Sequence, residues 1–252
     1  MTRTRTIALA ALTAALMLAG CSSDHYDRPS VAHAIDTLQG QKQATQTRLT
    51  TAAAEAIAAG QTEEALQHYQ KLYRNDKRDS SHALNYAQLL RRSGRSDEAL
   101  NVLAPFAKKA LGSKKAAASP LLLNEYAAIL IEHGKLGEAR EVIDLVLAED
   151  AYANSHADAM NLLGISLDAQ GRHKEAETMF RLALEGWNGN PTTVMNNLAL
   201  CLANQAMFDE SLTTLRQALV MAPDKQEIAR NIQLVSDLRD NVVAKPVNIK
   251  KN

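Results

Sequence analysis

The sequence predicts an all-α solenoid of about five helical hairpins, closed by a C-terminal capping helix. Five short segments are versions of one phrase, GQTEEAL, GRSDEAL, GKLGEAR, GRHKEAE and AMFDESL, which begin at Gly60, Gly94, Gly134, Gly171 and Ala206. Their starts lie 34, 40, 37 and 35 residues apart, which is the spacing of stacked helix pairs. No segment alternates apolar and polar residues cleanly enough to predict a strand. Because a solenoid works through a long surface, the pattern predicts a binding protein.

Each phrase marks the turn between the two helices of a hairpin. In the second hairpin, residues 81–90 place apolar side chains three and four positions apart, which predicts a helix with one buried stripe. Gly94 then supplies the left-handed backbone that ends a helix, and Ser96 is expected to cap the next one. Ala99 follows where the two helices cross, because a small side chain lets their backbones approach.

Small and large positions recur in register through all five repeats. A small residue stands seven positions before each phrase, at Ala53, Ala87, Ala127, Gly164 and Ala199. A second small residue stands five positions after each phrase begins, at Ala65, Ala99, Ala139, Ala176 and Ser211. Four residues further on is an apolar or aromatic residue, at Tyr69, Leu103, Ile143, Phe180 and Leu215. This pattern resembles the tetratricopeptide repeat over residues 46–223, with Pro223 as the closing proline, and implies that fold.

Two insertions lengthen the repeat, and a further helix follows the last one. The segment KKAAAS (residues 114–119) and residues 154–156 extend the loops before the third and fourth repeats. Each could be part of a binding face or only a tolerated surface loop. Residues 224–241 are expected to form the capping helix, whose apolar face carries Ile228, Ile232, Val235 and Leu238. The tail, residues 242–252, is expected to be disordered.

The amino terminus predicts export and lipid attachment. Arg3 and Arg5 precede an apolar run at residues 7–19, which is too short to span a bilayer of roughly 30 Å but suits a signal peptide over residues 1–20. The run ends in Leu-Ala-Gly-Cys21, which resembles a bacterial lipobox and implies lipidation of Cys21. Residues 21–45 would then be the lipidated N-terminus and a polar tether. Ser22, by similarity to lipoprotein sorting, implies the outer membrane and a periplasmic mature domain. The alternative is an ordinary signal peptide with a chance cysteine.

Composition and residue spacing argue against an enzyme or a nucleic-acid-binding protein. The 28 basic and 28 acidic side chains balance, so there is no strong basic field for nucleic acid. Cys201 lies in an apolar helical segment and is expected to be a buried core residue. The seven histidines show no paired spacing typical of metal ligands, and the glycines form no phosphate-binding loop. The sequence therefore predicts no catalytic residue, metal site, cofactor or small-molecule substrate.

The predicted ligand surface is the row of first helices of the hairpins, which line the groove in this fold. Polar side chains stand between the buried positions there, and carboxamides can satisfy both the donor and the acceptor of an extended peptide backbone. The predicted peptide-binding residues are Asn85, Gln88, Asn124, Asn161, Asn196 and Asn197. The alternative is that these side chains only solvate an exposed helix face.

A closer resemblance comes from the C-terminal run MNNLALCLANQAMFDESLTTLRQALVMAPDKQEIARNIQLV, residues 195–235, together with the lipobox. These features resemble the TadD family, the lipidated tetratricopeptide proteins of tight-adherence (Flp) pilus systems. The resemblance implies a non-catalytic outer-membrane lipoprotein that helps to assemble or localise the pilus secretin, with the secretin or other Tad components as partners. The alternative is another envelope scaffold: a type IV pilotin, a cell-wall hydrolase adaptor or an outer-membrane assembly factor.

Overall fold

The computed structural model describes residues 31–113 and 118–243. The chain divides into two compact units, Met1–Thr47 and Arg48–Asn252. Every element in the described part is helical, and it contains no strand, so the all-α prediction is confirmed. The lipidation site Cys21 and most of the predicted tail lie outside the described residues.

The first described element is the long helix α2 (Val31–Ala58), which carries the described part of the first unit and continues into the second. It runs through residues predicted as tether (31–45) and residues predicted as the start of the array, without a break. Its first half is mostly exposed. Buried alanines appear only later, at Ala53 and Ala56.

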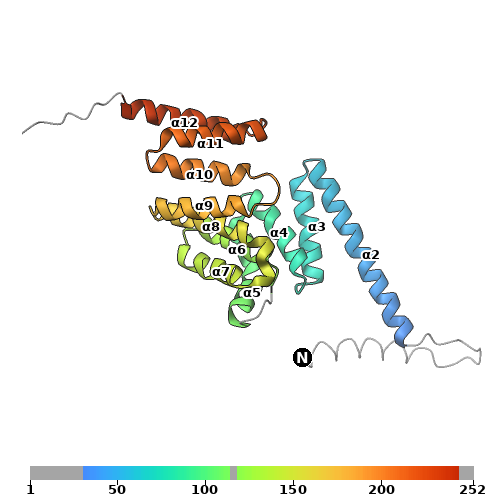
Figure 1. The fold of residues 1–252 in the computed structure, drawn as a ribbon. Helices are drawn as coiled ribbons and strands as arrows, with labels where there is room; N and C mark the ends of the chain where they lie inside the picture. Colours follow the sequence, from blue (N-terminus) through green and yellow to red (C-terminus); the bar gives the residue numbers. More distant parts are fainter. Residues whose placement is uncertain (1–30, 114–117, 244–252) are drawn as a thin grey trace, which may run out of the picture. The chain divides into compact units, whose positions relative to one another are not determined.

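The second unit continues with a series of helices that follow one another along the chain (Figure 1). These are α3 (Thr62–Asn75), α4 (Ser80–Arg92), α5 (Ser96–Ser113), α6 (Pro120–Glu132), α7 (Leu136–Ala148), the 3-10 helix η1 (Asp150–Ser155), α8 (His156–Ala169), α9 (His173–Glu185), α10 (Thr192–Asn204), α11 (Phe208–Met221) and α12 (Gln226–Val243). Each hairpin pairs two neighbouring helices: α4 with α5, α6 with α7, α8 with α9, and α10 with α11.

The hairpins stack so that their first helices form one layer and their second helices form another. Contact between successive hairpins is more extensive in the layer of first helices. Each first helix touches the first helix of the next hairpin, along the series α4, α6, α8 and α10, and α10 also touches α12. Among the second helices, α5 and α7 are the one pair in the described part of the array that makes comparable contact. The first helices therefore lie closer together and form the inner layer of the array, on which a ligand surface is expected.

The turns and crossings follow the predicted register. Gly60, Gly94, Gly134 and Gly171 have φ between 69° and 75°, and Ala206 has φ 60° in the corresponding turn. All ten predicted small positions are buried: those before the turns (Ala53, Ala87, Ala127, Gly164, Ala199) and those after them (Ala65, Ala99, Ala139, Ala176, Ser211). The small residues thus lie where the two backbones of a hairpin approach, as the pattern predicts.

Two local predictions were wrong. Ser96 does not cap α5: it is the first residue of the helix, and its hydroxyl donates to Glu132 Oε2 at 3.1 Å. Leu238 does not join the buried face of the last helix, although Ile228 and Val235 are fully buried. Leu238 is 43% exposed and falls with Leu234 and Val242 on a second, exposed apolar stripe, because α12 is the last described helix and is covered on one side only.

The first insertion contacts the 3-10 helix in which the second insertion begins, and their positions in the sequence do not reveal this contact. The second insertion, residues 154–156, overlaps the end of η1, and the buried Tyr152 of η1 donates its hydroxyl to the Ala118 carbonyl at 2.7 Å. Ala118 belongs to the first insertion. The Ser155 carbonyl at the end of η1 accepts a 3.2 Å hydrogen bond from Asn124 Nδ2 on α6. One residue of each insertion, Ala118 and Ser155, is therefore hydrogen-bonded to a helix of the array.

Candidate protein-binding face

The inner layer contains a hollow of about 250 Å³ between α4, α6 and α8. Every residue that lines it comes from the first helix of a hairpin: Gln88, Arg91, Leu121, Asn124, Glu125, Ala128, Asp158, Asn161 and Leu162. Because consecutive residues of a helix point about 100° apart, residues three and four positions apart share one face, as Leu121, Asn124, Glu125 and Ala128 do on α6. The helical register thus brings polar side chains of three successive repeats into one surface.

An ion-pair cluster forms one wall of the hollow. Arg91 Nε donates to Glu125 Oε1 at 2.6 Å, and Arg91 Nη2 donates to Glu125 Oε2 at 3.3 Å. Arg91 Nη1 also donates to Glu132 Oε1 at 2.7 Å. Glu125 is only 8% exposed, so its charge requires this partner. The cluster connects the ends of α4 and α6 and fixes the shape of the wall.

Two residues that line the hollow carry an acceptor without a partner among the described residues. Asp158, in the first turn of α8, is half-buried, and burial raises the pKa of its carboxyl group. It makes no hydrogen bond or ion pair within the described residues. Asn124 is 7% exposed, and its Oδ1 has no hydrogen-bond partner in the described part of the chain. Buried polar atoms without partners are uncommon in folded proteins.

The structure brings together three of the six predicted carboxamides. Gln88, Asn124 and Asn161 all line the hollow. Asn197 lies next to them, since its Nδ2 donates to Asn161 Oδ1 at 3.0 Å. Asn85 is exposed on α4 and does not line the hollow.

Asn196 is separated from this group and bonds with the last helix. Its Oδ1 accepts from Asn231 Nδ2 on α12 at 2.7 Å. Asn124 and Asn161 are buried rather than freely solvated. Hydrogen bonds of Asn161 and Asn196 also connect α8 to α10 and α10 to α12. Asp158, which the sequence interpretation missed, could have been found from its position three residues before Asn161, one helical turn away on the same face.

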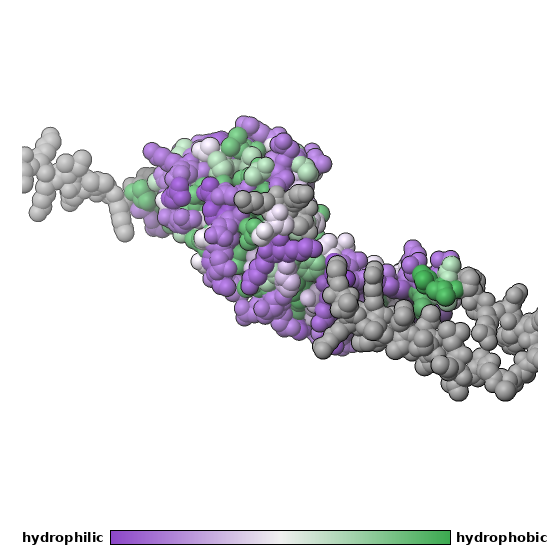
Figure 2. Space-filling model, turned by 90° about the horizontal axis from the view of Figure 1, so that it is seen from below, coloured by the Kyte–Doolittle hydropathy of each residue, from purple (hydrophilic) through white to green (hydrophobic). Residues whose placement is uncertain are grey.

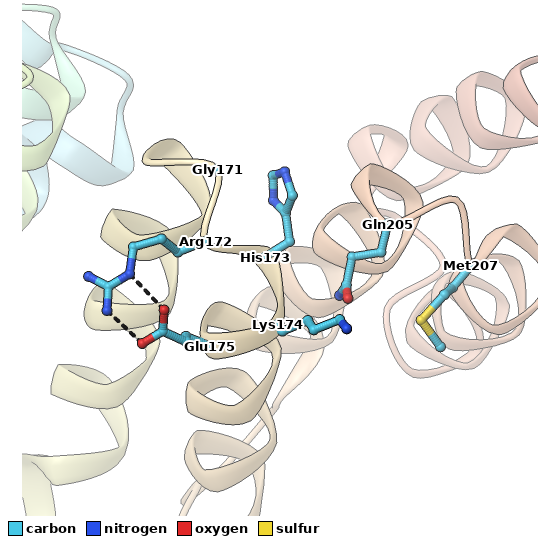
Figure 3. A pocket seen from close by; sticks show the side chains of 7 residues that line it. All are labelled: Gly171, Arg172, His173, Lys174, Glu175, Gln205 and Met207. Carbon is cyan, nitrogen blue, oxygen red and sulfur yellow. Dashed lines mark hydrogen bonds and ion pairs between the residues drawn. The ribbon is translucent and has the colours of Figure 1, made fainter.

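A second hollow, of about 570 Å³, lies at the turns rather than on the inner layer. Figure 3 shows its lining, which comes from the start of α9 and the turn before α11: Gly171, Arg172, His173, Lys174, Glu175, Gln205 and Met207. Arg172 Nε donates to Glu175 Oε1 at 2.7 Å, and Gln205 Nε2 donates to Glu177 Oε2 at 3.0 Å. These pairs engage the side chains of Arg172, Glu175 and Gln205.

Beside this hollow, three potential metal ligands converge from three helices. One ligand atom each of Asp168, His173 and Cys201 lies within 4.8 Å of the others. Their polar atoms are bonded to one another and to the backbone: His173 Nδ1 lies 2.6 Å from Asp168 Oδ1, and Cys201 Sγ donates to the His173 carbonyl at 3.2 Å. Burial, followed by the nearby Asp168 carboxylate, raises the pKa of the Cys201 thiol to about 12. The prediction that Cys201 is a buried core residue is confirmed, and this protonated thiol is a poor nucleophile.

The outer surface carries no single dominant apolar area on the side seen in Figure 2. Hydrophilic residues predominate there over the described array, and hydrophobic residues form smaller, separate areas. Within residues 31–113 and 118–243, no helix combines the length and the apolar character needed to cross a bilayer.

Comparison with known proteins identifies the architecture. Residues 30–234 match the family described as the Tetratricopeptide repeat protein 21 C-terminal ARM domain. The chain belongs to this family. The tetratricopeptide-type repeat predicted from the recurring small residues is therefore confirmed. No curated protein matches the sequence.

Solved structures agree on the fold of this repeat family. A chain of the APC/C hetero-tetramer Cut9-Hcn1 matches with TM-score 0.63 and 17% identity, over 76% of this chain and 36% of that one. A thermophilic TPR protein of Thermus thermophilus matches with TM-score 0.59 and 16% identity, over 75% of this chain and 98% of that one. A tetratricopeptide repeat protein from Parabacteroides merdae gives TM-score 0.53 and 17% identity, over 77% and 73% of the two chains. At these identities the likeness concerns the fold alone.

Proposed function

We propose that this repeat protein is a non-catalytic scaffold that binds polypeptide partners on the inner face formed by α4, α6 and α8. The observation that carries the proposal is the hollow in which Gln88, Asn124 and Asn161 converge from three successive repeats. Stacked repeats create extended binding surfaces of this kind. Carboxamide side chains offer a donor and an acceptor to a peptide backbone, so several in series suit an extended segment.

We further propose that the scaffold is anchored to the outer membrane through lipidated Cys21 and faces the periplasm. The support is the sequence: a basic start, a short apolar run, the Leu-Ala-Gly-Cys21 motif and Ser22 after it. Two or more acyl chains give a stable membrane anchor where one does not. The anchor would place the array where envelope machinery is assembled.

The proposed partners are the secretin or other components of a tight-adherence (Flp) pilus. The resemblance of residues 195–235 to the TadD family supports this assignment. A role as another envelope scaffold, such as a type IV pilotin, a hydrolase adaptor or an outer-membrane assembly factor, is the second candidate. Genes for a secretin, a pilus ATPase and a small prepilin beside this gene would favour the first.

The test of the binding face is partner capture from detergent-solubilised envelopes of the native host. The double variant Asn161→Ala/Asn197→Ala removes both members of one hydrogen-bonded pair, so no buried partner is left unpaired and the fold should survive. We expect this variant to lose captured partners, identified by mass spectrometry. The matched control is Asn101→Ala/Gln217→Ala, at exposed positions of the outer helices α5 and α11. Equal capture by both variants would refute the inner face as the binding site, and recovery of cell-wall hydrolases alone would refute the pilus assignment.

A further inference from the structure

We infer that the hollow between α4, α6 and α8 receives a basic side chain, lysine or arginine, of a partner polypeptide. This inference rests on the proposed protein-binding role of the inner face and names the chemistry that the face selects. It is carried by two residues that line the hollow, Asp158 and Asn124. The Asp158 carboxylate and the buried Asn124 Oδ1 have no partner within the described residues.

The charges around the hollow favour a cation. Arg91 is the only basic residue among those that line it, and it is shared between Glu125 and Glu132. The ion-pair cluster therefore carries one negative charge in excess. Asp158 adds a second negative charge that has no counter-ion in the described part of the chain. An acidic side chain would be repelled here, whereas an ammonium or guanidinium group would complete the charge balance.

The walls of the hollow suit the stem of a basic side chain. Leu121, Ala128 and Leu162 line it together with the polar residues, and Leu121 is 56% exposed although it is large and apolar. Lysine and arginine bury their methylene stems against apolar surface while the charged head finds polar partners. A hollow of about 250 Å³ accommodates a side chain rather than a folded element. Apolar walls with a negative lining match this one class of side chain.

The hydrogen bonding of Asn124 fixes which of its atoms is left for a ligand. The Ser155 carbonyl can only accept a hydrogen bond, so the Asn124 amide must direct its Nδ2 donor toward it. Oδ1 is then the atom without a partner. An acceptor buried without a donor costs free energy, and a ligand donor that reaches Oδ1 would remove that cost.

The position of Asp158 at the start of α8 does not by itself explain the unpaired groups and the exposed apolar residue of the hollow. A carboxylate in the first turn of α8 is stabilised by the helix dipole, which accounts for an acidic residue at this place. The dipole does not supply a donor to Asn124 on α6. It also does not explain why the exposed Leu121 lies on the same hollow. A basic ligand satisfies all three observations together.

The test compares two acetylated, amidated pentapeptides, Ala-Ala-Lys-Ala-Ala and the same peptide with norleucine in place of lysine. Norleucine keeps the apolar stem and removes the charge. Binding to the purified full-length protein in detergent is measured by ligand-observed saturation-transfer NMR over a range of peptide concentrations. We expect the lysine peptide to bind about 10-fold more tightly or better, as a charge-assisted hydrogen bond implies.

Two variants test whether the preference for the lysine peptide depends on the carboxylate in the hollow. Asp158→Asn, which keeps the shape of the side chain, should reduce the lysine preference to about 3-fold or less. Asp150→Asn, an equal charge change at an exposed position of η1 that does not line the hollow, should leave it intact. Circular dichroism of each variant verifies that it is folded, and the comparison of the two peptides on the unaltered protein does not depend on any variant.

The outcomes separate this inference from the proposed function. Equal binding of the lysine and norleucine peptides, including no binding of either, overturns the inference, as does a preference that survives Asp158→Asn. If partner capture still requires Asn161 and Asn197 in that case, the inner face remains the binding site and only its chemistry was misassigned. A lysine preference that depends on Asp158 supports the inference even where capture identifies partners other than a pilus secretin.

Discussion

At the scale of single residues, the fourth repeat differs from the others in a matched pair. It has Gly164 where the other repeats have alanine, and Phe180 where three of them have leucine or isoleucine. A Cβ added to Gly164 would lie 2.6 Å from Phe180 Cε1, and the Phe180 ring is buried. The small residue is therefore required by the size of the ring that packs on it.

The contact between Gly164 and Phe180 predicts that Gly164→Ala changes the free energy of unfolding in opposite directions in two backgrounds. Gly164→Ala should lower the free energy of unfolding by about 1 kcal/mol, because overpacking of about 1–3 kcal/mol outweighs a helix-propensity gain of about 1 kcal/mol. In a Phe180→Leu background the clash is absent, so the same change should stabilise by up to about 1 kcal/mol. Urea unfolding of the four proteins measures both effects. Equal shifts in the two backgrounds would contradict the contact.

The last turn predicts a stabilising substitution. Ala206 has φ 60° where the other four phrases begin with a glycine at positive φ. A left-handed conformation costs a residue with a Cβ about 1–2 kcal/mol, and the extra freedom of unfolded glycine returns about 0.5–1 kcal/mol of that. Ala206→Gly should therefore raise the free energy of unfolding by about 0.5–1 kcal/mol. Gly94→Ala is the reciprocal control and should lower it by a similar amount.

At the scale of elements, His133 links neighbouring hairpins. Its Nδ1 lies 2.8 Å from the Ile129 carbonyl and its Nε2 lies 2.9 Å from Asp97 Oδ1 on α5. Both partners are acceptors, so only the doubly protonated ring can donate to both. The hydrogen bond to the Ile129 carbonyl, and then the bond to Asp97, raise the pKa of His133 above its ordinary value of 6.5.

A raised pKa in the folded state predicts the direction of the pH dependence. The stabilisation from His133 should be fully present below pH 6.5, the unfolded value, and should be lost as the pH rises through the higher folded value. The melting temperature of the wild-type protein should exceed that of His133→Gln at pH 5.5 by more than at pH 8.5. NMR titration of His133 in the wild type and in Asp97→Asn checks the cause, since loss of Asp97 should lower the pKa. An unchanged pKa in that variant would contradict the linkage between α5 and α6.

The helices were predictable to the extent that local chemistry determines them. The turn glycines and the buried alanines predicted the hairpins. A turn glycine depends only on its own backbone conformation, and a buried alanine depends only on the close crossing of two helices that are neighbours in the sequence. Asp158 and the junction of the insertions were not predictable, because they depend on how α6, α8 and η1 are placed in space. Ser96 was misassigned for a similar reason: its hydroxyl bonds to Glu132, 36 residues later in the chain.

At the scale of the whole molecule, the proposed anchor separates membrane attachment from partner binding along the chain. Cys21 precedes the array, whose candidate face begins at α4. Cys21→Ser should leave an unlipidated precursor and abolish cofractionation with the outer membrane on a sucrose gradient. Cys201→Ser, a change at the other cysteine, should fractionate as wild type. If Cys21→Ser also remains in the outer-membrane fraction, attachment does not depend on a lipid.

The unequal lengths of the repeats limit how the inner face formed by α4, α6 and α8 can be redesigned. A version of the chain trimmed to a uniform 34-residue consensus would remove residues 114–119 and 154–156. Ala118 and Ser155 would be lost with them, and their carbonyls accept the hydrogen bonds of the Tyr152 hydroxyl and the Asn124 amide. Such a shortened scaffold could still stack its hairpins, because the crossings involve other residues. The inner face of this scaffold would nevertheless differ from the natural one, since the surroundings of Asn124 depend on a residue that breaks the symmetry of the repeats.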